Sequence, residues 1–252
     1  MSITKTEAEL LSHKTAALNK LEKYLDTLIS SPDEHLRGKA DKISYWLEDY
    51  AKFLDYETKF DPTKFPRYKR GQIIKVHLGF NIGSEEGGLH YAVVIENNNP
   101  YKSSTLNIVP LTSVKSTTDI SRLRTDLGQV YLGNELYRLL IAKVSTLNTT
   151  VINEINTLNT IVNTLPETDP QYQSVNNRIS KLQSEIATLN KMTKEISKMK
   201  KGSIALVGQI TTISKIRIYD PKNSCDVLSG IKVSNETLDK IDTTLRQLFT
   251  KI

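Results

Sequence analysis

Apolar residues recur every three or four positions over the first part of the chain, which is the spacing of one face of an α-helix. The first such stretch covers residues 4–29, with lysine and glutamate on the opposite side. Residues 30–33 then combine serine, proline and aspartate, which is typical of a helix end and restart. A second stripe covers residues 32–59, and two prolines stiffen residues 61–66. The pattern predicts an N-terminal helical hairpin followed by a linker.

The middle of the chain carries a second helical period, close to a strict heptad, on both sides of a break at residues 166–170. Heptads that flank a short break predict an antiparallel coiled-coil hairpin. The expected seam consists of Val144, Leu147, Val151, Ile155, Leu158, Val162 and Leu165, then Tyr172, Val175, Ile179, Leu182, Ile186, Leu189 and Ile196, with Thr193 as a polar seam position.

Short runs rich in β-branched residues, bounded by turn residues, lie on both sides of this coiled coil. They predict strands at residues 72–78, 90–96, 105–111, 204–210 and 212–219. A C-terminal helix is predicted at residues 234–250, with Leu238, Ile241, Leu245 and Leu248 on one face.

Together these elements predict an α+β fold. The simplest architecture is one small β-barrel with a C-terminal helix, interrupted by the coiled-coil hairpin and preceded by the helical hairpin, because a hairpin can be inserted into a loop whose ends are close. The expected domains are 1–62 for the N-terminal hairpin, 63–131 and 202–252 for the barrel, and 132–201 for the inserted coiled coil.

Charge is unevenly distributed along the chain. Residues 1–65 contain 10 basic and 12 acidic side chains, a net charge of −2, so the total of +6 leaves +8 for residues 66–252. A basic body favours a polyanionic partner such as nucleic acid, although a lysine-rich surface can equally be an ordinary solvated one.

Composition excludes several other classes. No stretch reaches the ~20 apolar residues of a membrane span, and the polar N-terminus lacks the apolar core of a secretion signal, so we expect a cytoplasmic protein with no membrane partner. Cys225 is the only cysteine, which excludes an intramolecular disulfide. The four histidines are scattered, so we expect no metal and no cofactor.

Residues 83–95 are the most informative candidate for a functional site. A glycine-rich loop with two carboxylates leads into an apolar strand. Glycines allow a tight turn and the close approach of a ligand. His90 stands at the junction, where a histidine is a candidate proton-transfer group near neutral pH.

The two β segments, read together, resemble the PemK/MazF family of toxin ribonucleases. The blocks that carry the resemblance are residues 69–73, Leu78, and residues 83–88, 92–97, 108–113 and 206–215, with 238–242 resembling the start of the family's closing helix. They occur in the family's order and cover about 110 of the 252 residues. Both helical hairpins lie outside the resemblance.

The resemblance implies a compact SH3-like barrel, usually dimeric, that cuts single-stranded RNA, often mRNA, without a metal. The usual partner is an antitoxin that occupies the RNA groove. We therefore expect a homodimer, an antitoxin protein as partner, and no cleavage of DNA.

The resemblance also implies site residues. Thr112 aligns with the family's catalytic threonine, while His90 and Thr211 stand where the family has arginine. The residues expected to contact RNA are Arg70, Ser84, Glu85, Gly87, Gly88, Asn97, Ser113, Gln209, Thr211, Thr212 and Lys215.

RNA cleavage through the substrate's own 2′-hydroxyl gives a 2′,3′-cyclic phosphate and requires a base, an acid and donors for the charge on phosphate. His90 can supply charge and move a proton, so we expect His90 and Thr112 to be catalytic. The alternative, which the two absent arginines favour, is a module that binds RNA or a protein without cutting it, with the coiled coil as scaffold. Residues 1–60 are expected either to shield the RNA groove or to pack on the coiled coil.

Overall fold

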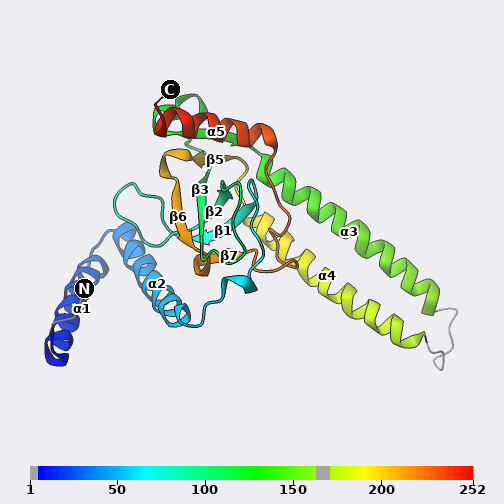
Figure 1. The fold of residues 1–252 in the computed structure, drawn as a ribbon, viewed down its shortest axis with the longest axis horizontal. Helices are drawn as coiled ribbons and strands as arrows, with labels where there is room; N and C mark the ends of the chain where they lie inside the picture. Colours follow the sequence, from blue (N-terminus) through cyan, green and yellow to red (C-terminus); the bar gives the residue numbers. More distant parts are fainter. Residues whose placement is uncertain (1–4, 163–170, 252) are drawn as a thin grey trace. The chain divides into compact units, whose positions relative to one another are not determined.

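The computed structural model describes residues 5–162 and 171–251 (Figure 1). The chain divides into two compact units, Met1–Thr58 and Lys59–Ile252. Over the described residues, no helix combines the length and the apolar character needed to cross a membrane.

The first unit is a pair of helices, α1 (Glu7–Ile29) and α2 (Glu34–Glu57), as the two apolar stripes predict. Thr6 caps α1 in a capping box, since the Glu9 N–H donates to the Thr6 hydroxyl and the Thr6 N–H donates to the Glu9 carboxylate. Asp33 caps α2 by accepting from the His35 N–H at 2.8 Å. The Asp33 cap explains why a second helix begins directly after the break at residues 30–33.

The second unit is built on an antiparallel sheet with strand order β4-β5-β3-β2-β1-β7, in which β6 also pairs with β3. The strands are β1 (Ile73–His77), β2 (Leu89–Val94), β3 (Thr105–Ser113), β4 (Gln129–Gly133), β5 (Ser203–Leu206), β6 (Thr211–Ser214) and β7 (Ile218–Asp220). The α+β class is confirmed. Strand β4 was not predicted, and the two long strands expected over residues 204–219 are three short ones separated by 3₁₀ turns.

Strand β3 organises the sheet because one of its edges serves two partners. Residues 105–108 pair with β6, and residues 111–113 pair with β5, while β2 occupies the other edge. The sheet must therefore bend along β3. The hydrogen-bonded path ends at β4 and β7, so the barrel-like sheet is not closed by pairing between its end strands.

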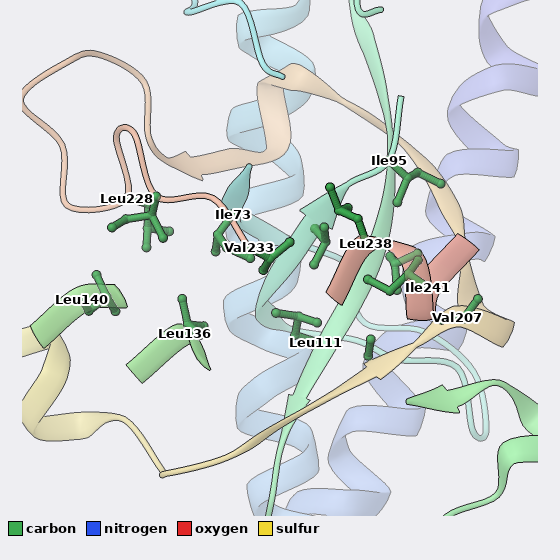
Figure 2. Packing of buried hydrophobic residues seen from close by; sticks show 14 of the residues in the cluster. Ile73, Ile95, Leu111, Leu136, Leu140, Val207, Leu228, Val233, Leu238 and Ile241 are labelled. Atoms are coloured by element: carbon green, nitrogen blue, oxygen red, sulfur yellow. The ribbon is translucent and has the colours of Figure 1, made fainter. Parts of the chain in front are cut away.

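Both faces of the sheet are covered, because successive strand residues point to opposite sides. On β1, Ile73 belongs to one buried cluster, whereas Ile74 and Val76 belong to the other. The first cluster, which we call the main core, collects side chains from the strands and from three helices. Figure 2 shows part of this core, including Leu136, Leu140, Leu238 and Ile241. These helices are α3 (Glu135–Val162), α4 (Tyr172–Lys198) and α5 (Asn235–Phe249). Leu238 and Ile241 of α5 are buried there, as its sequence predicts.

Helices α3 and α4 form the predicted antiparallel hairpin, and its base belongs to the main core (Figure 1). Leu136 and Leu140 of α3 and Met192 of α4 are buried among strand residues. Farther along, Val151, Leu158, Val175 and Leu182 form a separate cluster between the two helices. The break expected at residues 166–170 and the seam residue Leu165 lie outside the described residues.

Polar contacts also fix the base of the hairpin. The Glu135 carboxylate accepts from the Ser234 N–H at 2.6 Å and from the Thr237 hydroxyl, at the start of α5. The Lys143 ammonium donates to the carbonyls of Val227 at 2.9 Å and Ser229 at 2.7 Å. Burial lowers the pKa of Lys143, which nearby Asp220 and Asp226 partly oppose. The hairpin is thus continuous with the barrel at its base.

On α4, Glu195 makes the corresponding contact with the sheet. Its carboxylate pairs with Lys75 of β1 and accepts from the Tyr91 hydroxyl of β2. Burial raises the pKa of Glu195, but the hydrogen bonds from Lys75 and Tyr91 outweigh this effect and leave the pKa below its ordinary value.

The seam of the coiled coil differs from the predicted one. Ile155 is 38% exposed and Ile179 is 37% exposed, so neither is enclosed between the helices. Near the base, the buried residue is Met192, at 0% exposure, and the predicted seam residue Thr193 is exposed. The heptad prediction was wrong there because Met192 of α4 is buried in the main core together with Leu136 and Leu140 of α3.

This shift gives a test of the register. Met192→Ala should lower the free energy of unfolding by about 2–4 kcal/mol, since it removes a fully buried side chain and leaves a cavity. The neighbouring Thr193→Ala should change it by less than about 0.5 kcal/mol, as expected at an exposed position. Denaturant melts compare the two variants; equal losses would contradict the register.

Candidate active site

A cleft of about 630 Å³ opens at one end of the β1–β2 ladder. It is lined by the segment after β1, by Pro110 of β3, by the turn between β5 and β6, and by one arginine. The lining residues are Leu78, Asn81, Ser84, Glu85, Glu86, Pro110, Gly208, Gln209, Ile210, Thr211, Ile213 and Arg217. Four of the residues expected to contact RNA are among them: Ser84, Glu85, Gln209 and Thr211.

The glycine-rich loop, residues 83–88, is closed at its base by backbone hydrogen bonds. The Gly88 N–H donates to the Gly79 carbonyl at 2.6 Å, and the Leu78 N–H donates to the Gly88 carbonyl at 2.7 Å. A side chain at Gly87 would place its Cβ 2.9 Å from the Gly79 oxygen, and Gly88 has a φ of +88°. Both predicted glycines are thus required by the shape of the loop.

Gln209 clamps the loop from the other side of the cleft. Its Oε1 accepts from the Glu86 N–H at 2.6 Å, and its Nε2 donates to the Ser84 carbonyl at 3.2 Å. Asn81 adds a third bond, from its Nδ2 to the Glu86 carbonyl at 2.7 Å. The sequence predicted Gln209 as an RNA contact, and in the structure its amide is engaged in holding the loop.

Gln209→Ala should therefore speed exchange of the Glu86 amide hydrogen. Each lost hydrogen bond costs about 1 kcal/mol, which corresponds to roughly fivefold faster exchange. Hydrogen–deuterium exchange of peptides covering residues 80–88 measures this effect. Gln247→Ala, an exposed glutamine on α5, is the control and should leave the loop unchanged.

His90, on β2, is partly buried and is held at both ring nitrogens. Its Nδ1 lies 3.1 Å from the Leu111 carbonyl oxygen, and its Nε2 lies 3.0 Å from Oε1 of Glu86. A carbonyl and a carboxylate can only accept, so both contacts are hydrogen bonds when both nitrogens carry protons. Glu86 lines the cleft, which places the His90–Glu86 pair at its edge.

Thr112 follows directly after Leu111, whose carbonyl oxygen contacts His90. It is partly buried on β3 and pairs with Ile204 of β5. Ser113 is the exposed end of the same strand. Neither Thr112 nor Ser113 lines the cleft. Thr112 is the neighbour of the residue that contacts His90, but it is not part of the cleft wall.

Arg217 is a cleft residue that the sequence did not single out. Its Nε donates to the His77 carbonyl at 2.8 Å and its Nη2 donates to the Leu78 carbonyl. Burial lowers its pKa, but a guanidinium stays charged in proteins. A cation thus lines the cleft although Thr211 replaces the family's arginine. The sequence did not indicate Arg217 because the residue lies within a predicted strand. In the structure this segment is the 3₁₀ turn Lys215–Arg217, which brings Arg217 to the cleft.

Other predicted contacts lie elsewhere. Arg70 pairs with Asp242 and donates to the Ile95 carbonyl. Both Arg70 and Asn97 line a separate pocket. Thr212 is exposed and its hydroxyl donates to Asn107. Lys215 is 1% exposed, with its ammonium 5.9 Å from the centre of the Tyr68 ring, and burial lowers its pKa. Lys215 is therefore not accessible to RNA, which corrects that expectation.

The charged side chains that line the cleft are Glu85, Glu86 and Arg217. The cleft wall therefore carries no excess of positive charge, unlike the chain as a whole at +6. Within the part of the chain that the structure describes, no group of three His, Cys, Asp or Glu side chains is arranged to hold a metal.

Comparison with protein families places this site in context. Residues 69–182 match the profile of PemK-like, MazF-like toxins of type II toxin–antitoxin systems. The match includes the glycine-rich loop, His90 and Thr112 and ends within α4, before Gln209 and Arg217. A search of curated proteins gave no match. The match covers 114 of the 252 residues and supports a relationship of this part of the chain to the PemK/MazF-like toxins of type II systems, which are generally endoribonucleases.

Proposed function

We propose that this protein is an endoribonuclease that cleaves single-stranded RNA, including mRNA, by attack of the 2′-hydroxyl and without a metal. The observation that carries the proposal is the His90–Glu86 pair, 3.0 Å apart at the edge of the cleft. The reaction needs a base that reaches the 2′-hydroxyl and an acid that reaches the 5′-oxygen of the same phosphate, and this pair supplies one group of each kind.

In the proposed reaction the Glu86 carboxylate accepts the proton of the 2′-hydroxyl, and the 2′-oxygen attacks the adjacent phosphorus. The bond between phosphorus and the 5′-oxygen breaks, and protonated His90 donates its Nε2 proton to that oxygen. The products are a 2′,3′-cyclic phosphate and a 5′-hydroxyl. The proton on Glu86 can then return to His90 across the 3.0 Å contact.

The remaining groups stabilise charge and position. Arg217 is proposed to attract the phosphate, where a partly buried cation acts more strongly than an exposed one because less water screens it. Thr112, next to the carbonyl that orients His90, is proposed to donate its hydroxyl to a phosphate oxygen. Ser84, Glu85 and Thr211 line the cleft where exposed bases offer hydrogen-bonding edges.

The proposed biological setting follows from the family. We propose an antitoxin protein that binds over the cleft, a homodimer as the working assembly, and action in the cytoplasm, where mRNA is available.

The test is incubation of the pure protein with single-stranded RNA in EDTA. Fragments that end in 2′,3′-cyclic phosphate support the proposal. RNA that is bound but stays intact would support instead a module that binds without cutting.

A further inference from the structure

A second pocket, of about 360 Å³, lies at the opposite end of the β1–β2 ladder from the cleft. Arg67, Lys69, Arg70 and Lys232 line it together with residues 97–99, three consecutive asparagines. Only Arg70 among these cations pairs with a carboxylate in the described residues, that of Asp242. We call this site the cationic pocket.

Several of these cations are held in place by the fold. The stem of Lys232 crosses Gly71 so closely that a Cβ there would lie 2.8 Å from its Cε, and Lys232 also forms a β-bridge with Gln72. The Arg67 Nη2 donates to Asn98 Oδ1 at 2.5 Å. A cation that is already positioned loses less freedom when it binds an anion.

The pocket also contains an unused acceptor. Asn99 is 2% exposed, and its Nδ2 donates to Glu96 at 2.7 Å and to the Thr105 carbonyl at 3.0 Å, which fixes the orientation of the amide. Its Oδ1 has no hydrogen-bond partner within the described residues. A nucleotide offers phosphate oxygens for the cations that line the pocket.

We propose that the cationic pocket binds phosphates of the RNA strand outside the cleft. The identity of the polyanion as RNA rests on the proposed function. The cleft wall carries two carboxylates and one arginine, so it supplies little attraction for a polyanion. The nine residues from Arg70 to Leu78 span at most about 26 Å, so one extended strand of several nucleotides can reach both sites.

The test uses Arg67→Gln, Lys69→Gln and Lys232→Gln together, and Lys191→Gln, Lys194→Gln and Lys200→Gln as a control of equal charge change. Binding of a 2′-O-methyl oligonucleotide of about 15 nucleotides, which cannot be cleaved through its 2′-oxygen, is followed by fluorescence anisotropy at several salt concentrations. The pocket variant should bind at least about tenfold more weakly, and its slope of log K against log salt should fall by about 2. The control should match the wild type.

Three outcomes would overturn the proposal: an unchanged slope in the pocket variant, an equal loss in the control, or equal competition by a glutamate-rich peptide. Cleavage of a substrate of about four nucleotides, too short to reach the pocket, should stay within about twofold of wild type. If the wild type cleaves no RNA but the pocket variant still loses binding, the pocket assignment stands and the proposed nuclease function fails. Thermal melts verify that both variants fold.

Discussion

His90→Ala should lower kcat for RNA cleavage by about 10²–10⁴-fold, because it removes the proposed acid and the charge beside the phosphate. KM should change much less, since the cleft wall and the cationic pocket remain. Single-turnover cleavage of a fluorescent oligonucleotide measures the effect. His13→Ala, at an exposed position on α1, is the matched control and should cleave like the wild type.

A second substitution separates charge from proton transfer. His90→Arg keeps a cation, as the family has at this position, but a guanidinium does not release its proton at neutral pH. If His90 acts as the acid, this variant should stay well below wild-type activity. Full activity in His90→Arg would show that the charge alone matters and would remove the acid role from His90.

Shortening the coiled coil should leave the protein folded and active, whereas removing its base should unfold it. Arg178 pairs with Glu154 at 2.6 Å, and Met192 shares the main core with Leu140. These two contacts define the register of α4 against α3. Joining Leu147 to Glu185 through a short glycine–asparagine turn deletes the outer cluster and keeps the base. The cleavage rate of this shortened variant should stay within about threefold of the wild-type rate, because the deleted residues lie far from the cleft.

Deleting residues 135–200 instead removes Leu136, Leu140 and Met192 from the main core. Each such loss costs about 2–5 kcal/mol, so the sum approaches the whole stability of a typical domain. This variant should show no cooperative thermal transition. Circular dichroism melts compare the two deletions. A cooperative melt of the larger deletion would show that the hairpin base is not needed for the barrel to fold.

Much of the fold was accessible from local patterns in the sequence. The periodic stripes and the break at residues 30–33 placed α1, α2 and α5 to within a few residues. Strands β1, β2 and β3 followed from β-branched runs. Strand β4 did not, because its pairing partner β5 lies beyond the whole coiled coil and its residues alternate only weakly in burial.

The candidate site was predictable where chemistry follows from the loop itself. The glycines and His90 are local features, and Glu86 was visible beside them, but its pairing with His90 depends on how the loop folds. Lys215 was expected to contact RNA and Arg217 was not. A 3₁₀ turn replaces the predicted strand there, so Lys215 lies against Tyr68 and Arg217 lines the cleft. The hydrophobic periodicity of the sequence does not indicate this turn.

The most direct test of the account is the chemistry of the RNA ends that the protein leaves. A single-stranded oligoribonucleotide is cut by the wild-type protein in EDTA, and mass spectrometry identifies the chemical groups at the fragment ends. This measurement assumes no role for any residue. We expect a 2′,3′-cyclic phosphate on one fragment and a 5′-hydroxyl on the other, and no cut where the attacking nucleotide carries a 2′-O-methyl group. A 3′-hydroxyl with a 5′-phosphate, or cleavage of the methylated substrate, would contradict it.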